Sequence, residues 1–194
     1  MTLQPPADAQ PEVQQIPPST AELLAGMDEE QAALALGLGV LVQRAAAVEY
    51  TLHGLYAHLG DVERPYTDNP HESVTHFIKK AKSRLAAIPE ERIPTRDRTA
   101  LLHDLDRCTA GFEQRNRYIH GYWAYDEETY AWRIVKGTKG LNRPEITVAY
   151  SEDVWELADE FNRLHAKLIA WDAHFFGTPG NPALGEPPAS SKRL

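Results

Sequence analysis

The chain has 194 residues, of which 42% are apolar and 25% are charged, and this is enough to bury one core within a single domain. Its formal net charge is −8, so the surface as a whole repels nucleic acid and any RNA-binding role must rest on a local basic patch. The single cysteine, Cys108, excludes an internal disulfide and suits a reducing compartment.

Targeting and membrane signals are not recognisable in the sequence. The most apolar stretch, residues 32–42, is shorter than the roughly 18 residues that predict a membrane span, and Gln43 and Arg44 follow it. The first residues, MTLQPP, lack the features of a secretory signal or a transit peptide. We therefore expect a cytoplasmic protein without a membrane segment.

Both ends of the chain have the composition of disordered tails. Residues 1–20 hold five prolines and little apolar content, so burial cannot repay the entropy of ordering them. Residues 177–194 contain Gly, Pro and Ser without apolar periodicity. These tails are expected to flank one domain at residues 21–176.

Apolar residues at three- and four-residue spacing predict three helices before residue 123. Asp28 and Thr95 are the expected N-caps of the first and third helices. Gly60 and Pro89 are expected to end the first and second. The expected helical segments are about 27–59, 72–88 and 95–122.

The periodicity then changes to that of β-structure. Residues 129–135 and 146–150 are rich in β-branched and aromatic side chains, which predicts a hairpin through the loop 136–144, inside a β region of about 124–150. Ser151 is the expected N-cap of a last amphipathic helix. The sequence thus predicts an all-α fold, a four-helix bundle with a β-hairpin inserted before the last helix.

A group of polar residues lies late in the third predicted helix. His120 and Asn116 are one helical turn apart and share a face, while Arg115 lies about 140° round the axis from His120 but has a long side chain. These three side chains are therefore expected to converge near the end of the helix. They are the candidate catalytic residues.

Arg115 and Asn116, followed by three residues and His120, match the Arg-(Asn/Asp/His)-x-x-x-His motif of HEPN domains, which are all-helical, and the chain resembles that family in this segment. Tyr122 extends the match to the Arg-x4-His-x-Tyr motif of HEPN toxins that are encoded beside a minimal nucleotidyltransferase antitoxin. The resemblance implies a metal-independent ribonuclease of toxin or defence type that needs no cofactor. It also implies a homodimer with the two motifs facing across a cleft, and an antitoxin of nucleotidyltransferase type as a partner.

These residue types suit RNA cleavage without a metal. The reaction needs a base to take the 2′-hydroxyl proton and an acid to protonate the leaving 5′-oxygen, and a histidine near neutral pH can serve as either. His120 of a second chain would take the other role. Arg115 would hold the scissile phosphate, leaving a 2′,3′-cyclic phosphate and a 5′-hydroxyl, and Asn116 would orient His120 or the phosphate.

Two supporting residues each have an alternative interpretation. Glu49, midway along the first helix among apolar neighbours, would pair with Arg115 or orient His120; the alternative is an ordinary exposed helix residue. Tyr122 would belong to the extended motif; the alternative is a core or interface aromatic.

Some basic residues are candidates for RNA contacts, or else form an ordinary solvated face. These candidate RNA-binding residues are Arg117, Lys136, Lys139 and Arg143.

The whole motif has an alternative as well, in which the arginines form surface ion pairs and His120 merely ends a helix. The chain would then be a catalytically inactive helical module that binds protein or RNA. No metal-ligand set or phosphate-binding loop is recognisable in the sequence.

Overall fold

The computed structural model describes residues 25–60, 73–129, 131–137 and 145–177, and the predicted tails lie almost entirely outside them. In these ranges the chain is mostly helical, with a small antiparallel sheet before the last helix. The elements are α2 (Glu29–Gly60), α4 (Val74–Ala87), α5 (Thr95–His120), β1 (Tyr122–Asp126), β2 (Ala131–Lys136), β3 (Glu145–Ala149) and α6 (Ser151–Phe176).

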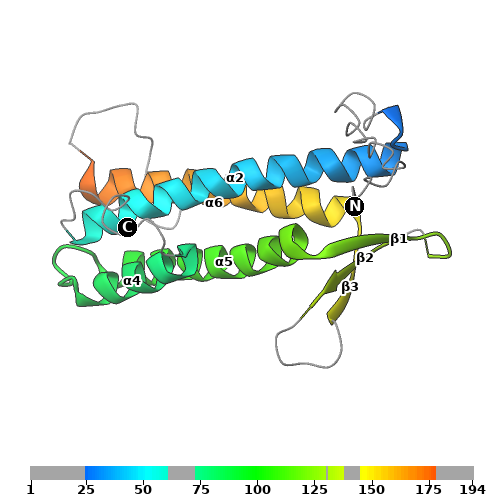
Figure 1. Cartoon of the computed structure of the whole chain (residues 1–194). Helices are drawn as coiled ribbons and strands as arrows, with labels where there is room; N and C mark the ends of the chain where they lie inside the picture. Colours follow the sequence, from blue (N-terminus) through cyan, green and yellow to red (C-terminus); the bar gives the residue numbers. More distant parts are fainter. Residues whose placement is uncertain (1–24, 61–72, 130, 138–144, 178–194) are drawn as a thin grey trace, which may run out of the picture.

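Figure 1 shows α2 and α6 side by side along their length, with α4 and α5 beneath them and the sheet at the end of the bundle where α5 stops. α2 and α6 run in the same direction, since Arg44 midway along α2 pairs with Asp159 in the first half of α6, while His58 near the end of α2 pairs with Asp172 near the end of α6. α5 runs in the opposite direction to α6. The core lies between these helices.

The apolar stripes that define the helices in the sequence are the surfaces that meet in this core. Because they recur every three or four residues, each helix buries one face along its whole length. The largest side chains with almost no exposed surface are Trp171, Phe77, Phe112, Phe161, Leu41, Leu52, Leu55, Ile78, Leu85, Leu101, Leu105 and Ile134.

Within the described ranges, α2 is the helix that length and composition alone would allow to cross a membrane. The core helix of a bundle passes the same test, and α2 packs along α6 with residues such as Leu41, Leu52 and Leu55 fully buried. Its outer face nevertheless keeps large apolar side chains exposed, among them Leu36 and Tyr50. The absence of a membrane segment stays a prediction.

One of the three predicted N-caps is confirmed. The carboxylate of Asp28 accepts a hydrogen bond from the backbone N–H of Gln31 at 2.7 Å, and the Gln31 side chain accepts one from the N–H of Asp28. This reciprocal arrangement satisfies donors that the first turn of α2 leaves without helical partners.

The predictions for Thr95 and Ser151 are wrong by one residue, because each is already helical and the residue before it has the extended backbone of an N-cap. Pro94 precedes α5 and Tyr150 precedes α6. The Thr95 hydroxyl donates instead to Glu90. At α6 the Asp153 carboxylate accepts from the N–H of Tyr150 at 2.8 Å, so an acidic residue in the first turn does the capping.

The predicted hairpin is confirmed, but it is part of a larger sheet. β2 and β3 pair antiparallel, with Val135 opposite Ile146. The prediction that α5 reaches Tyr122 is wrong, since the helix ends at His120 and residues 122–126 form β1, which pairs with β2 in the order β1-β2-β3. The aromatic residues between Tyr122 and Asp126 suit a strand, and pairing with β2 stabilises the segment in that state.

Gly121 separates α5 from β1, and its lack of a side chain is required there. A Cβ at this position would lie 2.2 Å from Cγ2 of Ile134 and 2.8 Å from the carbonyl oxygen of Arg117. We expect Gly121→Ala to lower the free energy of unfolding by about 1–3 kcal/mol, because a fully buried strand residue and a helix backbone would have to move. Urea denaturation measures this effect.

Gly39→Ala is the matched control for this experiment. No atom of the described residues lies within 4 Å of a Cβ added to Gly39 in the interior of α2, so alanine should raise stability there by about 0.5–1 kcal/mol. Equal effects at the two positions would show that the junction between α5 and β1 tolerates a side chain.

Candidate functional site

The motif residues occupy the last two turns of α5, and the start of the sheet holds this helix end in place. Tyr118 is buried in the core, and its carbonyl oxygen accepts a hydrogen bond from the indole N–H of Trp123 on β1 at 2.7 Å. The two rings also pack together, with centroids 5.6 Å apart. The backbone is therefore fixed on both sides of His120.

Arg115 and Asn116 contact each other directly. Nη1 of Arg115 donates to Oδ1 of Asn116 at 3.0 Å, and both side chains are half-buried. Nε of Arg115 is buried and has no hydrogen-bond acceptor among the described residues. No carboxylate in the described part of the chain pairs with this guanidinium, so its charge is available to an anionic ligand.

His120 is exposed, and it makes no hydrogen bond or ion pair with the described residues. It is the last residue of α5. The ring is open to solvent and to a ligand.

Arg117 forms an ion pair across the junction with the sheet. Its Nε lies 3.7 Å from Oε1 of Glu145 at the beginning of β3. Both side chains are partly exposed, so the pair contributes little stability but reduces the positive charge beside the motif. Lys136, at the end of β2, lies opposite the same Glu145 in the strand register. Lys139 and Arg143, the other two predicted RNA contacts, lie outside the described residues.

The two supporting residues, Tyr122 and Glu49, differ in how they lie relative to the motif. Tyr122 follows the motif directly and is 73% exposed, so it does not belong to the core. Glu49 is half-buried on α2, and no hydrogen bond or ion pair joins it to Arg115 or His120 in the described ranges.

Two pockets formed by described residues lie away from the motif. One, of about 270 Å³, lies between α5 and α6 and is lined by Gln114, Asp153, Glu156, Leu157, Glu160 and Arg163. The other, of about 250 Å³, lies between α2 and α6 near His58 and Asp172. Neither of these two pockets is lined by Arg115, Asn116 or His120.

Comparisons with protein-family models, curated proteins and solved structures find no match to this chain. The likeness to HEPN domains therefore rests on the motif and on its place late in a helix of a small bundle.

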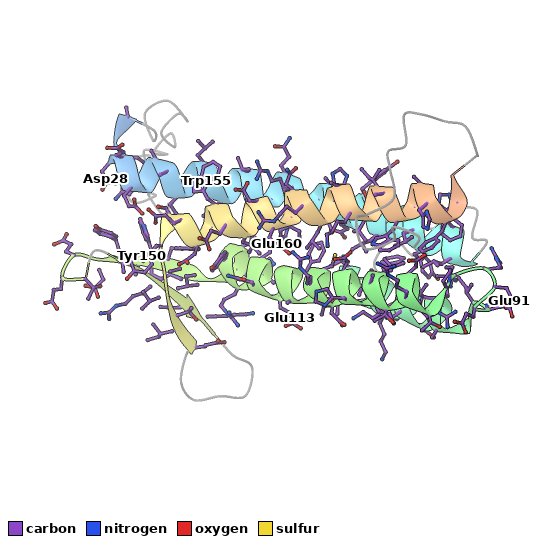
Figure 2. All side chains as sticks on the ribbon, turned by 180° about the vertical axis from the view of Figure 1, so that it is seen from behind. Asp28, Glu91, Glu113, Tyr150, Trp155 and Glu160 are labelled. Carbon is purple, nitrogen blue, oxygen red and sulfur yellow. The ribbon has the colours of Figure 1, made fainter. Side chains whose placement is uncertain are left out.

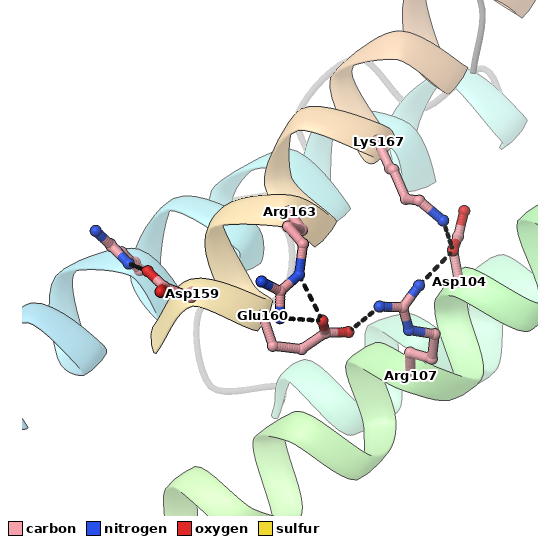
Figure 3. Close-up of polar contacts among 7 residues, drawn as sticks. Asp104, Arg107, Asp159, Glu160, Arg163 and Lys167 are labelled. Atoms are coloured by element: carbon pink, nitrogen blue, oxygen red, sulfur yellow. Dashed lines mark hydrogen bonds and ion pairs between the residues drawn. The ribbon is translucent and has the colours of Figure 1, made fainter. Parts of the chain in front are cut away.

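A polar network that sequence reasoning missed joins α5 to α6, as Figure 3 shows. Asp104 is 2% exposed, and its carboxylate accepts from Lys167 at 2.8 Å and from the indole N–H of Trp171 at 3.0 Å. Arg107 lies 3.5 Å from the same carboxylate and also binds Glu160. These contacts link charged residues of α5 to residues of α6, so the network helps to fix the pairing of the two helices.

Cys108 lies in the same region and is fully buried. Burial, together with the carboxylates of Asp104 and Glu160, raises the pKa of its thiol to about 12, against a smaller lowering by Arg107 and Lys82. The thiol is therefore protonated at neutral pH and is not a nucleophile. Among the described residues, no three His, Cys, Asp or Glu side chains gather in a way that could hold a metal ion.

Proposed function

We propose that this protein is an RNA endonuclease of toxin or defence type, in which His120 is the general acid or base and Arg115 binds the scissile phosphate. The observation that carries the proposal is the exposure and bonding of the motif residues. An exposed histidine ends α5 and has no hydrogen-bond or ion-pair partner among the described residues. Within two turns of it lies Arg115, which is hydrogen-bonded to Asn116 and pairs with no carboxylate in the described ranges.

The proposed reaction is an internal transfer. A base removes the 2′-hydroxyl proton, the 2′-oxygen attacks phosphorus, and the bond from phosphorus to the 5′-oxygen breaks as an acid protonates that oxygen. Arg115 stabilises the negative charge that develops on the phosphate. One His120 supplies one of the two proton transfers, and His120 of a second copy supplies the other. The proposal thus includes a cytoplasmic homodimer, restrained by an antitoxin of nucleotidyltransferase type.

A catalytically inactive binding module is the second candidate. It is favoured by the place of the two pockets that the described residues form, since active sites are usually concave and neither pocket contains the motif. In that case Arg115 and His120 contact a partner molecule without transferring protons.

The test is cleavage of labelled RNA in excess EDTA by wild-type protein and by His120→Ala, with mapping of the product ends. We expect cyclic phosphate ends and a rate loss of at least about 100-fold in the variant. His103→Ala is the matched control, because His103 is an exposed histidine on the same helix outside the motif. If wild type and His120→Ala are equally active, or both inactive on diverse RNAs, the binding module is the better assignment.

A further inference from the structure

A pocket of about 250 Å³ lies between the second half of α2 and the last turns of α6. It is at the end of the bundle away from the sheet: Figure 1 shows α2 and α6 ending there, and in Figure 2 both helices end on the side of Glu91, opposite Tyr150. The proposed function uses none of the side chains that line it. The polar ones are Thr51, His58 and Asp172, and the apolar ones are Ile169, Ala173 and Phe176.

His58 and Asp172 form a pair at this pocket. Nδ1 of His58 on α2 lies 2.6 Å from Oδ1 of Asp172 on α6. When a neutral imidazole donates the proton on Nδ1 to a carboxylate, its Nε2 is left as an acceptor. Among the described residues, no donor contacts that Nε2 or the second carboxylate oxygen of Asp172. Both side chains are partly exposed, so a molecule from solvent can reach these two acceptors.

The other hydrogen-bonding groups of the lining are acceptors or are already bonded. The Thr51 hydroxyl donates its one proton to the carbonyl oxygen of Ala47 at 3.0 Å, so its oxygen can only accept a further bond. The backbone N–H of Gly177 donates to the carbonyl oxygen of Ala173 at 2.9 Å. α2 and α6 both end here, and the last carbonyl groups of a helix carry partial negative charge. With His58 neutral, the described lining therefore offers a ligand acceptors and no free donor.

The charge and the apolar wall of the pocket define the ligand further. Asp172 is negative, and no lysine or arginine is among the described residues that line the pocket. Phe176 places an aromatic ring beside His58, with the ring centroids 5.5 Å apart, and Ile169 and Ala173 extend the apolar surface. The face of an aromatic ring also attracts a cation directly.

The pocket between α5 and α6 differs from this one in its charge. It is lined by Asp153, Glu156 and Glu160, but Arg163 also lies in it and is paired with Glu160 at 3.1 Å. A cation of the chain itself thus neutralises part of that lining, whereas the described partner of Asp172 is a histidine.

We propose that the pocket between α2 and α6 binds a small organic cation, namely a primary ammonium ion that carries a short apolar group. An ammonium has three donors and no acceptor, which matches the free oxygen of Asp172, Nε2 of His58 and the hydroxyl oxygen of Thr51. Its charge balances that of Asp172, and its apolar group lies against Phe176 and Ile169. A volume of about 250 Å³ is below the roughly 300–1,000 Å³ of pockets that take drug-sized molecules, so the ligand is small.

The experiment compares three probes of similar size and different charge: phenethylammonium, the neutral phenethyl alcohol and the anion hydrocinnamate. Each is titrated into isotope-labelled protein in slightly alkaline buffer, where an ordinary imidazole is neutral, and the backbone amide signals are followed by NMR. We expect phenethylammonium to bind with a Kd at least about tenfold lower than the alcohol, because charge-assisted hydrogen bonds are stronger than neutral ones. The amides that shift should belong to the second half of α2 and the last turns of α6.

Two variants test the role of the carboxylate. Asp172→Asn keeps the shape of the side chain but removes its charge, and should raise the Kd for phenethylammonium by at least about tenfold. Asp159→Asn is the matched control, since Asp159 is an exposed aspartate of α6 that pairs with Arg44 outside the pocket, and the Kd of this variant should stay within about twofold of wild type. Urea denaturation establishes that both variants are folded.

Equal affinity for phenethylammonium and phenethyl alcohol, or tighter binding of hydrocinnamate, would overturn the proposal. Equal weakening in Asp172→Asn and Asp159→Asn would do the same, because the amine would then be attracted by the net charge of −8 rather than bound in the pocket. Amide shifts confined to other helices would also overturn it. Arg115 and His120 do not line the pocket, so failure of the RNA cleavage test would remove the nuclease proposal and leave the cation site standing.

Discussion

Asp104→Ala is expected to lower the free energy of unfolding by about 3–5 kcal/mol. The carboxylate is buried between α5 and α6, where it satisfies the indole N–H of the fully buried Trp171 and faces the ammonium of Lys167. Alanine would leave that N–H without an acceptor and Lys167 without its counter-ion. Leaving a buried donor unsatisfied costs more than the hydrogen bond itself contributes.

Two further variants separate burial from charge in this experiment. Asp104→Asn keeps an acceptor for Trp171 and should be less destabilising than Asp104→Ala. Asp106→Ala, two residues along the same helix, removes a 71% exposed side chain whose partner is Lys82, and should cost less than about 1 kcal/mol. Urea denaturation gives all three values. If Asp104→Ala costs no more than Asp106→Ala, the network does not stabilise the pairing of α5 with α6.

Local signals in the sequence were sufficient for most helices and for the hairpin. The expected segments 27–59 and 72–88 agree within two residues at each end with α2 and α4, because apolar stripes end at Gly60 and Pro89. The β-branched run of β3 likewise predicted its pairing with β2. In each case the residues that decide the structure are close in sequence.

The end of α5 depended on contacts that the sequence does not display. Residues up to Tyr122 fit a helical stripe, while the aromatics from Tyr122 onward also fit a strand. Pairing of β1 with β2 and the hydrogen bond from Trp123 to the carbonyl oxygen of Tyr118 stabilise this segment as a strand. A segment compatible with both patterns takes the one that tertiary contacts support.

The burial of Asp104 also could not be predicted from nearby residues in the sequence. A charged residue beside Leu105 in an amphipathic helix normally faces solvent, and its burial depends on Trp171, 67 residues away. The link from Glu49 to the motif stays a prediction. Periodicity gives the position of Glu49 along α2 but not how α2 is rotated against α5, and no hydrogen bond or ion pair joins it to Arg115 in the described residues.

Arg115→Ala is expected to slow RNA cleavage by about 100- to 1,000-fold while leaving the fold nearly as stable as wild type. The loss of rate follows from removing a preorganised donor for the charge that develops on the phosphate. Stability should change little, because the side chain makes one hydrogen bond, to Asn116, and its buried Nε has no acceptor in the described part of the chain. Single-turnover rates and urea denaturation together measure both effects.

Arg115→Lys distinguishes charge from geometry. Lysine keeps the positive charge but lacks the planar fork that binds two phosphate oxygens, so most of the rate loss should remain. Arg163→Ala, which removes the same charge from an exposed position on α6 paired with Glu160, should leave the rate within about threefold of wild type. Full activity in Arg115→Lys would show that a point charge is sufficient at this position. Full activity in Arg115→Ala would instead remove the arginine from the mechanism and leave His120 without the phosphate contact that the proposal requires.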